Sequence, residues 1–276
     1  MKKNSSLPIV IWSIVSTGIM FFCISFIIVY IFIKGAHVVD MTFIIDRPRG
    51  FPLGSDGGIF PAIMGSLMFT GIACIVASLL AISTAIYIVF YCKNSLIENI
   101  VRSIIESTAG IPSIVLGLFG YTFLVLHMGL GISLLSGGIV LGIMIFPFIE
   151  VRVEKSLEEI DRQIIYSSYA LGVSRSYTII KLVMRESVYD IASAIALSSG
   201  FAMGATAPIM LTGGVVYSGV PKSIFSPSMA LPYHLYILIG ESISLEYAYG
   251  TALVLVGILI VINFMALLAG FFKRGE

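Results

Sequence analysis

The sequence has 276 residues, of which 58% are hydrophobic and 11% are charged, and its formal net charge is +1. Its mean hydropathy is +1.05, whereas about a quarter of the residues in a soluble domain are charged. This composition excludes a soluble globular protein and predicts an all-α membrane protein. We expect one transmembrane domain over residues 1–276, with no length left for a second, soluble domain.

The first two apolar segments are predicted to be membrane-spanning helices. Residues 7–33 carry no charge and follow a short basic start, Lys2 and Lys3. The segment is too long for the apolar part of a signal peptide and lacks a small-residue cleavage site, so we expect a retained first helix. The second span, 60–91, begins with Pro61, which the first turn of a helix tolerates. A turn-rich polar loop separates the two.

One uncharged stretch is too long for a single span and suffices for two, which we place at 107–128 and 132–149. Either Gly129–Gly131 or Ser136–Gly138 supplies the turn between them. Pro112 predicts a kink in the first of the two helices.

The fifth span, 191–212, is rich in glycine, alanine and serine. Small residues let helices approach closely in lipid, and Gly200 and Gly204 have the spacing of a GxxxG pair. Helix packing and the lining of a transport pathway both fit this composition. The sixth span is placed at 247–272. Before it, residues 229–240 are apolar but too short to span, which indicates an interfacial or re-entrant helix.

The basic residues predict the orientation of these helices. With the N-terminus in the cytoplasm, twelve Lys and Arg residues fall in the inner segments and four in the outer segments. The sequence therefore predicts six spans with both termini in the cytoplasm. The four outer basic residues are Lys34, Arg47, Arg49 and Lys222.

The segment 150–190 lies in the cytoplasm in this topology. It holds six of the sixteen basic residues and seven of the fifteen acidic residues, and its apolar residues recur at helical spacing. Gly172 is unfavourable inside a helix and Ser174 is a good N-cap, so we expect two short helices that are broken between them. An apolar stripe needs a partner surface, which predicts docking on a soluble protein. A merely solvated loop is the alternative.

Catalytic and metal-binding constellations are not apparent in the sequence. The three histidines, His37, His127 and His234, are scattered, and the three cysteines show no pairing pattern. We therefore expect no catalytic residues, no metal site and free thiols. Ion-driven carriers keep ionisable groups inside the membrane. Their scarcity here indicates an external source of energy.

Four stretches carry a resemblance to a known family: Ser107–Gly120, Tyr169–Ser174, Gly204–Gly214 and Leu231–Tyr236. They resemble the A-type membrane permease subunit of bacterial phosphate ABC importers, the PstA family. Ser107–Gly120 is similar to the family's AGIPSIVxGLFG segment, and Gly204–Gly214 resembles its GETAPLLxTGG segment. Tyr169–Ser174 resembles the cytoplasmic EAA loop that docks on the ATPase, and Leu231–Tyr236 is similar to a late LPxxIY segment.

This resemblance implies a type I ABC importer permease, with 150–190 as the coupling loop between helices 4 and 5. It implies import of inorganic phosphate by alternating access in the bacterial cytoplasmic membrane. The implied partners are a related second permease, two ATPase subunits that use ATP and Mg²⁺, and an extracytoplasmic solute-binding protein. No cofactor is implied in this chain. The implied ATPase-coupling residues are Ala170, Leu171, Gly172, Val173, Ser174, Arg175 and Tyr177, and the implied pathway residues are Ser198, Ser199, Gly204, Thr206 and Pro208.

The sequence departs from the family pattern in the predicted pathway. The family has an Arg four residues before the Glu of GETAP, and those positions are Phe201 and Ala205 here. Three interpretations stay open: the partner permease supplies the Arg, the solute is a different oxyanion or polar solute, or the subunit has become regulatory. A passive channel or a secondary carrier would need no ATPase, and a membrane enzyme would need reactive residues.

Overall fold

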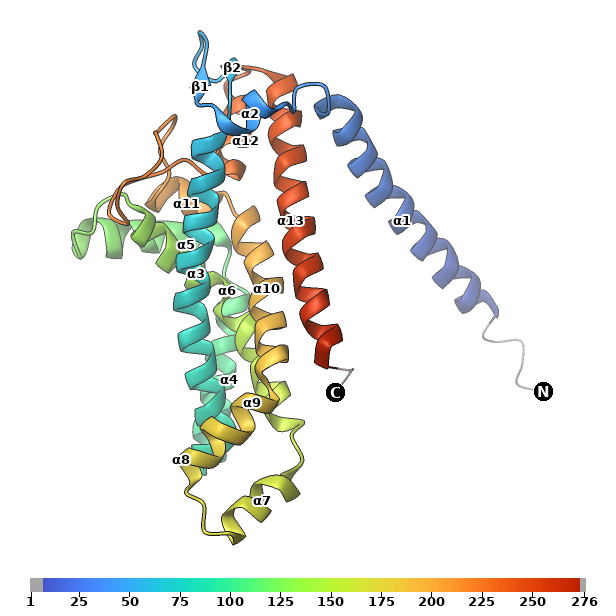
Figure 1. Cartoon of the computed structure of the whole chain (residues 1–276), viewed down its shortest axis with the longest axis vertical. Coiled ribbons are helices and arrows are strands. Elements are labelled where there is room, and N and C mark those ends of the chain that lie inside the picture. The colour runs from blue at the N-terminus through green and yellow to red at the C-terminus, as the bar shows by residue number, and fades with distance from the viewer. Residues whose placement is uncertain (1–6, 274–276) are drawn as a thin grey trace.

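Backbone polar groups in lipid must be paired within one segment, so apolar stretches of this length fold as helices. The computed structural model describes residues 7–273, with side chains over 9–267, and shows a helical bundle (Figure 1). The longer helices are α1 (Leu7–Gly35), α3 (Phe60–Ile86) with the π-helical extension η1 (Tyr87–Tyr91), α4 (Ser95–Ala109), α6 (Leu134–Glu158), α10 (Val188–Gly204) and α13 (Leu245–Lys273).

Shorter elements connect these helices. They are α2 (Met41–Ile45), the strands β1 (Pro48–Arg49) and β2 (Asp56–Gly57), α5 (Ser113–Gly120) with the π-helical extension η2 (Tyr121–His127), α7 (Arg162–Ala170), α8 (Arg175–Thr178), the π-helical turn η3 (Ile179–Val183), α9 (Met184–Glu186), α11 (Ala207–Thr212) and α12 (Leu231–Gly240). The two strands form a small antiparallel hairpin.

Four of the described helices are long and apolar enough to cross a membrane: α1, α3 with η1, α6 and α13. A fifth crossing is available if α4 and α5–η2 count as one broken span. Helix α10 has 17 residues and is shorter than the other four. The chain is therefore multi-pass, and the count of six spans stays a prediction.

The predicted helix over 107–128 is interrupted. Helix α4 starts twelve residues earlier, at Ser95, and ends at Ala109, and α5 begins at Ser113 after a bend of 100°. Pro112 causes the break, because proline lacks a backbone N–H and disfavours the helical conformation of the residue before it. The predicted kink is thus a complete change of direction.

The predicted helix over 132–149 begins at Leu134 and continues to Glu158. The turn before it contains Gly129 and Gly131, both with positive φ, so the first of the two predicted turns is confirmed. The C-terminal extension is held by a buried apolar stripe at four-residue spacing, formed by Ile149, Val153 and Leu157. The cytoplasmic segment predicted from Glu150 thus begins as a continuation of α6.

The predicted helix over 191–212 is also broken. Helix α10 ends at Gly204, Ala205 has an extended backbone, and α11 begins at Ala207. Pro208 at the start of α11 has no N–H to donate to the Gly204 carbonyl, so the hydrogen bond that would continue α10 is missing there. A Cβ placed on Gly204 would meet nothing within 4 Å, whereas one on Gly200 would lie 3.8 Å from side-chain atoms of Leu259 and Asn263 on α13. Within the described chain, Gly200 alone of the predicted GxxxG pair therefore faces another helix.

The most extensive helix contact is instead that of α3 with α6. A Cβ on Gly142 of α6 would lie 3.0 Å from Cβ of Val76 on α3, so only a glycine allows this approach. On α3 the matching surface is an alanine ladder at four-residue spacing, which is fully buried. It consists of Ala73, Ala77, Ala81 and Ala85. Small residues on both helices therefore build the centre of the bundle.

The hairpin, α2 and α12 lie at one end of the bundle (Figure 1). Helix α12 is attached there by polar contacts: Ser66 Oγ of α3 accepts a hydrogen bond from the Leu231 N–H at 2.7 Å, and His234 Nδ1 lies 3.2 Å from Thr251 Oγ1 of α13. In the loop before α12, burial raises the pKa of Tyr217, and Glu241 adds to the effect. The expected short helix near 229–240 is confirmed as a buried element at this end.

Helices α7, α8 and α9 lie at the opposite end of the bundle, and α13 runs from the hairpin end towards them (Figure 1). Segment 150–190 and the direction of α13 thus mark one end of the bundle, which is the predicted cytoplasmic side. Lys2, Lys3 and Arg274, which entered the prediction of orientation, lie outside the described residues.

Candidate functional site

The segment after α6 folds as two short helices separated by a turn. Helix α7 ends at Ala170, and Gly172 has a φ of +77°, a left-handed conformation that favours glycine at a helix C-terminus. The side chain of Ser174 accepts a hydrogen bond from the Tyr177 N–H at 3.4 Å and caps α8. The predicted break at Gly172–Ser174 is therefore confirmed.

The turn between α7 and α8 projects from the end of the bundle (Figure 1). Leu171 at its tip is 84% exposed, and Tyr177 is also exposed. We call Ala170, Leu171, Gly172 and Tyr177 the coupling surface. An exposed leucine and tyrosine on a projecting, capped turn form a surface suited to a protein partner.

The coupling surface is anchored from behind by contacts within the chain. Ser168 of α7 and Thr178 of α8 are buried, and their hydroxyl oxygens lie 2.9 Å apart. The guanidinium carbon of Arg175 lies 4.4 Å from the ring centroid of Tyr91, at the end of η1, in a cation–π contact. Among the predicted coupling residues, Ser174 and Arg175 thus contact their own chain, and Val173 is half-buried.

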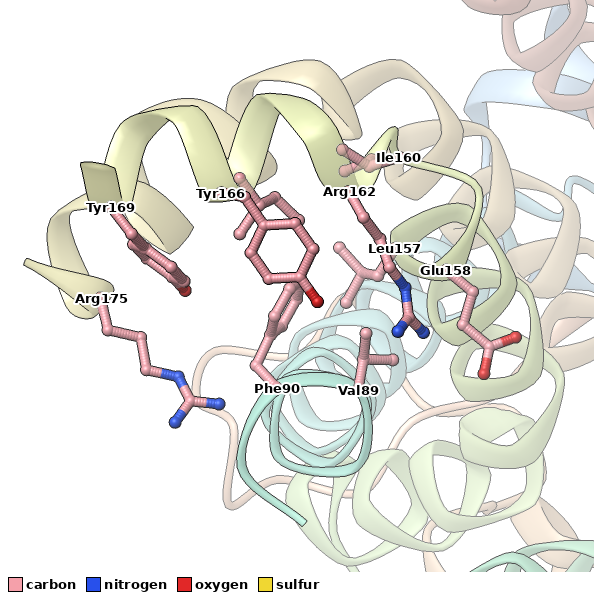
Figure 2. A pocket seen from close by; sticks show the side chains of 10 residues that line it. Val89, Phe90, Leu157, Glu158, Ile160, Arg162, Tyr166, Tyr169 and Arg175 are labelled. Atoms are coloured by element: carbon pink, nitrogen blue, oxygen red, sulfur yellow. The ribbon is translucent and has the colours of Figure 1, made fainter. Parts of the chain in front are cut away.

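A cavity of about 180 Å³ lies between α7 and the ends of η1 and α6. Tyr166 and Tyr169 point from α7 towards Phe90 of η1, and Glu158 and Arg162 lie at its other side (Figure 2). The coupling surface therefore rests on aromatic side chains that connect it to the end of the η1 extension of α3.

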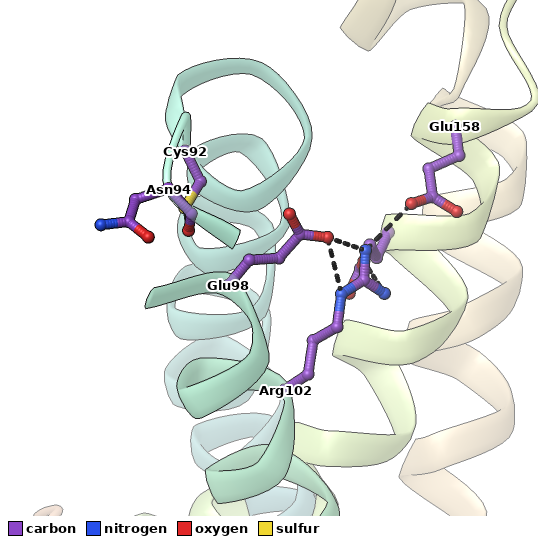
Figure 3. Close-up of polar contacts among 6 residues, drawn as sticks. Cys92, Asn94, Glu98, Arg102 and Glu158 are labelled. Carbon is purple, nitrogen blue, oxygen red and sulfur yellow. Dashed lines mark hydrogen bonds and ion pairs between the residues drawn. The ribbon is translucent and has the colours of Figure 1, made fainter. Parts of the chain in front are cut away.

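A charged cluster joins α4 to α6 close to this cavity. Arg102 of α4 lies between Glu98 of its own helix and Glu158 of α6 (Figure 3). Its guanidinium nitrogens are 3.0 Å from Glu98 and 3.1 Å from Glu158, and Arg102 also pairs with the buried Glu154 of α6. One guanidinium thus serves three carboxylates. A fourth, Glu150, lies one turn before Glu154 on α6 and is 0% exposed.

A second cavity, of about 430 Å³, is lined by α4, α6 and α10 and has a mostly apolar wall. Phe148 of α6 and Phe201 of α10 stack across it, with ring centroids 5.1 Å apart and an interplanar angle of 3°. Ser198, Glu106 and Arg152 supply its polar groups. We call this cavity the aromatic groove. Phe201, at the position where the resemblance implies an Arg, is 61% exposed.

The structure separates the predicted pathway residues. Ser198 lines the aromatic groove, whereas the hydroxyl of Ser199 donates a hydrogen bond to the Ala196 carbonyl of its own helix at 2.7 Å. Gly204 is exposed, Thr206 is half-buried in the break after α10, and Pro208 is buried against α5. These five residues do not share one face, and Ser198 is the one among them that lines the groove.

Sequence reasoning missed Phe148, Arg102, Glu150 and Glu154. A signal for the two glutamates was present, since they alternate with Ile149, Val153 and Leu157 at helical spacing on a helix that was predicted to end before them. The stacking of Phe148 on Phe201 joins residues of two helices far apart in the sequence, so a single sequence carries no signal for it.

Comparisons with known proteins agree on one family. A model of the family described as binding-protein-dependent transport system inner membrane component matches residues 77–274. The chain is 31% identical over 227 residues to a protein of Methanocaldococcus jannaschii named probable phosphate transport system permease protein PstA, and the match covers 80% of each chain. It is 29% identical over 218 residues to the phosphate transport system permease protein PstA 1 of Mycobacterium tuberculosis, covering 78% of this chain and 71% of the relative.

Solved structures share the fold at lower identity. A chain of the MetNI methionine ABC transporter in an inward-facing conformation matches with a TM-score of 0.61 and 18% identity, covering 76% of this chain and 92% of that chain. A chain of an amino acid ABC transporter matches with a TM-score of 0.54 and 15% identity, covering 78% of this chain and 92% of that chain.

Proposed function

The chain belongs to the family of binding-protein-dependent transport system inner membrane components, and from this premise we propose that it is the permease subunit of an ATP-driven importer of inorganic phosphate. It is a multi-pass membrane protein with the fold of type I ABC importer permeases. Permeases of this family work with an ATPase and a solute-binding protein. The proposal concerns the solute, the composition of the complex and the orientation of the chain.

The coupling surface is the observation that carries the proposal. An exposed Leu171 lies beside a left-handed Gly172 between two capped helices. Ser168 joins the two helices to each other through Thr178, and Arg175 contacts Tyr91 of the bundle. A rigidly mounted apolar tip suits the transfer of movement from a soluble motor. We assign the coupling role to Ala170, Leu171, Gly172 and Tyr177 as contact residues, and to Val173, Ser174 and Arg175 as residues that position them.

In the proposed mechanism, two ATPase subunits dock on the coupling surfaces of this chain and of a related second permease. ATP binding in the presence of Mg²⁺ closes the ATPases and turns both permeases outward-open, and hydrolysis returns them. A binding protein delivers the anion from outside. The chain contributes the pathway and holds neither a cofactor nor a catalytic site. Both termini and segment 150–190 lie in the cytoplasm.

We propose phosphate as the solute because the two relatives are named phosphate transport permeases and this chain retains the four stretches that resemble the PstA family. Moving such an anion along an apolar pathway costs free energy unless cations or hydrogen-bond donors replace its hydration. Phe201 and Ala205 supply neither. We therefore propose an asymmetric site in which the second permease provides the cation and this chain supplies hydroxyl groups, with Ser198 in the groove and Thr206 in the break after α10.

A different oxyanion or polar solute is the second candidate, and the stacked Phe148 and Phe201 favour it. A less charged solute gives up less hydration free energy when it moves against an aromatic wall. A passive channel or a secondary carrier fits the coupling surface less well, since neither needs an ATPase.

Uptake by the whole complex tests the proposal. Vesicles that contain this chain, the second permease, the ATPase and the binding protein are supplied with radiolabelled phosphate, with and without ATP inside. We expect uptake that requires ATP and the binding protein and that an excess of unlabelled phosphate suppresses. Suppression by another oxyanion but not by phosphate would replace the solute. Equal uptake without ATP would remove the importer assignment.

A further inference from the structure

Glu150 is a buried acid without a visible counter-charge of its own. It is 0% exposed, and within residues 7–273 no hydrogen-bond donor reaches either of its carboxyl oxygens. An isolated carboxylate in an apolar interior is so costly that such a group takes up a proton instead. Glu150 is thus unlike Glu98 and Glu158, whose carboxylates contact Arg102 and remain partly exposed.

The neighbour of Glu150 is a second buried acid. Glu154 is one helical turn away on the same face of α6, is 4% exposed, and pairs with Arg102. Two carboxylates at this spacing repel each other, whereas one carboxyl and one carboxylate form a charge-assisted hydrogen bond. A proton on Glu150 converts the first arrangement into the second and leaves Glu154 ionised for Arg102.

The charged groups around Glu150 and Glu154 do not supply a second cation that could neutralise both carboxylates. Helix α4 presents Arg102 and Glu98 to the pair, and α6 adds Glu158. Glu106 of α4 and Arg152 of α6 are exposed at the aromatic groove. On α3 no titratable residue lies between Cys74 and Tyr87, and α10 carries none after Asp190, which accepts a hydrogen bond from Ser156. Helices α5 and α11 carry none. One arginine therefore faces four glutamates.

We propose that Glu150 and Glu154 bind one proton between them as a carboxyl–carboxylate pair, and that this proton keeps α4 attached to α6 through Arg102. Ile105 is the one fully buried residue of α4, so the polar attachment is a large part of what holds this helix. When the proton leaves, two buried anions compete for one guanidinium, and α4 separates from α6. The proton moves between Glu150 Oε and water at the end of the bundle that carries α7.

The direction of the pH effect follows from this balance. The bound proton stabilises the α4–α6 contact at neutral and lower pH, and stability falls as the pH rises and the proton is lost. Proton binding itself does not depend on the proposed function, whereas an effect on phosphate uptake would rest on it. The first test therefore observes the carboxyl group directly.

Infrared spectroscopy of the purified complex separates a protonated carboxyl group, through its carbonyl band, from a carboxylate. We expect one such band at neutral pH that disappears reversibly at alkaline pH and is absent in Glu150→Gln. The matched control is Glu159→Gln at the C-cap of the same helix, whose exposed carboxylate lies 3.9 Å from Lys155. It should keep the band. A band that survives in Glu150→Gln, or that is lost in the control, overturns the proposal.

Thermal unfolding provides a second readout. The unfolding temperature of the native complex should fall with rising pH, and Glu150→Gln, which retains a donor for Glu154, should lose most of that dependence. If Glu150→Gln does not assemble, infrared spectra of the native complex over a range of pH still test the proposal. The absence of the carbonyl band at every pH from mildly acidic to alkaline contradicts it. Both readouts are independent of solute, so failed phosphate uptake would count against the proposed function and not against the proton site.

Discussion

Two regions of this molecule differ in the chemistry of their side chains. The end that carries α7 and α8 is rich in charge, with Arg102 among Glu98, Glu154 and Glu158 and with Arg175 against Tyr91. The aromatic groove of α4, α6 and α10 has Phe148 stacked on Phe201 where the family has a cation. From this difference we propose that this chain has kept the residues for coupling to an ATPase and that a partner permease recognises the anion.

The proposed coupling role of the charged end requires that the coupling surface lies in the cytoplasm. Single cysteines are introduced at Gly54, Lys222 and Arg162 in a background without Cys23, Cys74 and Cys92. A membrane-impermeant thiol reagent applied outside should label the first two positions and leave Arg162→Cys unlabelled until the membrane is opened. The expected contrast is all or none. Labelling of Arg162→Cys from outside would invert the topology and detach the coupling surface from any cytoplasmic ATPase.

The largest effect of a point substitution is expected at Leu171. Leu171→Asp places a charge on a side chain that is 84% exposed, so the fold should persist while docking fails. Loss of a central apolar contact in an interface costs about 2 kcal/mol, or roughly thirtyfold in affinity. Co-purification of the ATPase measures this loss. Gln163→Asp, on exposed α7 surface, is the control and should retain the ATPase; equal retention in both variants would place docking elsewhere.

Gly172 tests the shape of the same surface. At a φ of +77° a tryptophan is strained by about 1–2 kcal/mol, in addition to its bulk, so Gly172→Trp should reduce ATPase binding by roughly tenfold. Asparagine tolerates this conformation, and Gly172→Asn should retain most of the binding. The amount of inserted permease should be the same in both. If Gly172→Trp supports full uptake, the turn does not enter the interface.

A smaller effect is expected at Arg175, which positions the coupling surface. A cation–π contact on an exposed site contributes about 0.5–1 kcal/mol. Arg175→Ala should therefore raise the ATP hydrolysed per phosphate taken up by about threefold, with Arg175→Lys in between. Tyr91→Leu should give the same change and add nothing to Arg175→Ala. Additive effects would mean that the two residues act separately.

The sequence predicted the helical class, the family and the break at Gly172–Ser174, because apolar length, a glycine and an N-cap act locally. It missed the break at Pro112 and the break before Pro208, and it ended the helix over 132–149 before its true end at Glu158. At both breaks a proline lies within an apolar run. Whether such a proline kinks a helix or breaks it depends on the packing of neighbouring helices, which the sequence does not show. The alanine ladder of α3 and the stack of Phe148 on Phe201 depend on which helices become neighbours, so periodicity in one segment does not reveal them.

The most direct test of the asymmetric assignment is phosphate uptake by complete vesicles with native permease and with Phe201→Arg together with Ala205→Glu. The double variant restores the family's pair of charges but removes the Phe148 stack, which contributes about 0.5–1.5 kcal/mol. If the partner provides the cation, native vesicles take up phosphate with ATP, and the double variant takes up no more than the native complex. Uptake that appears only in the double variant would contradict the account, since this chain would then need its own charge pair.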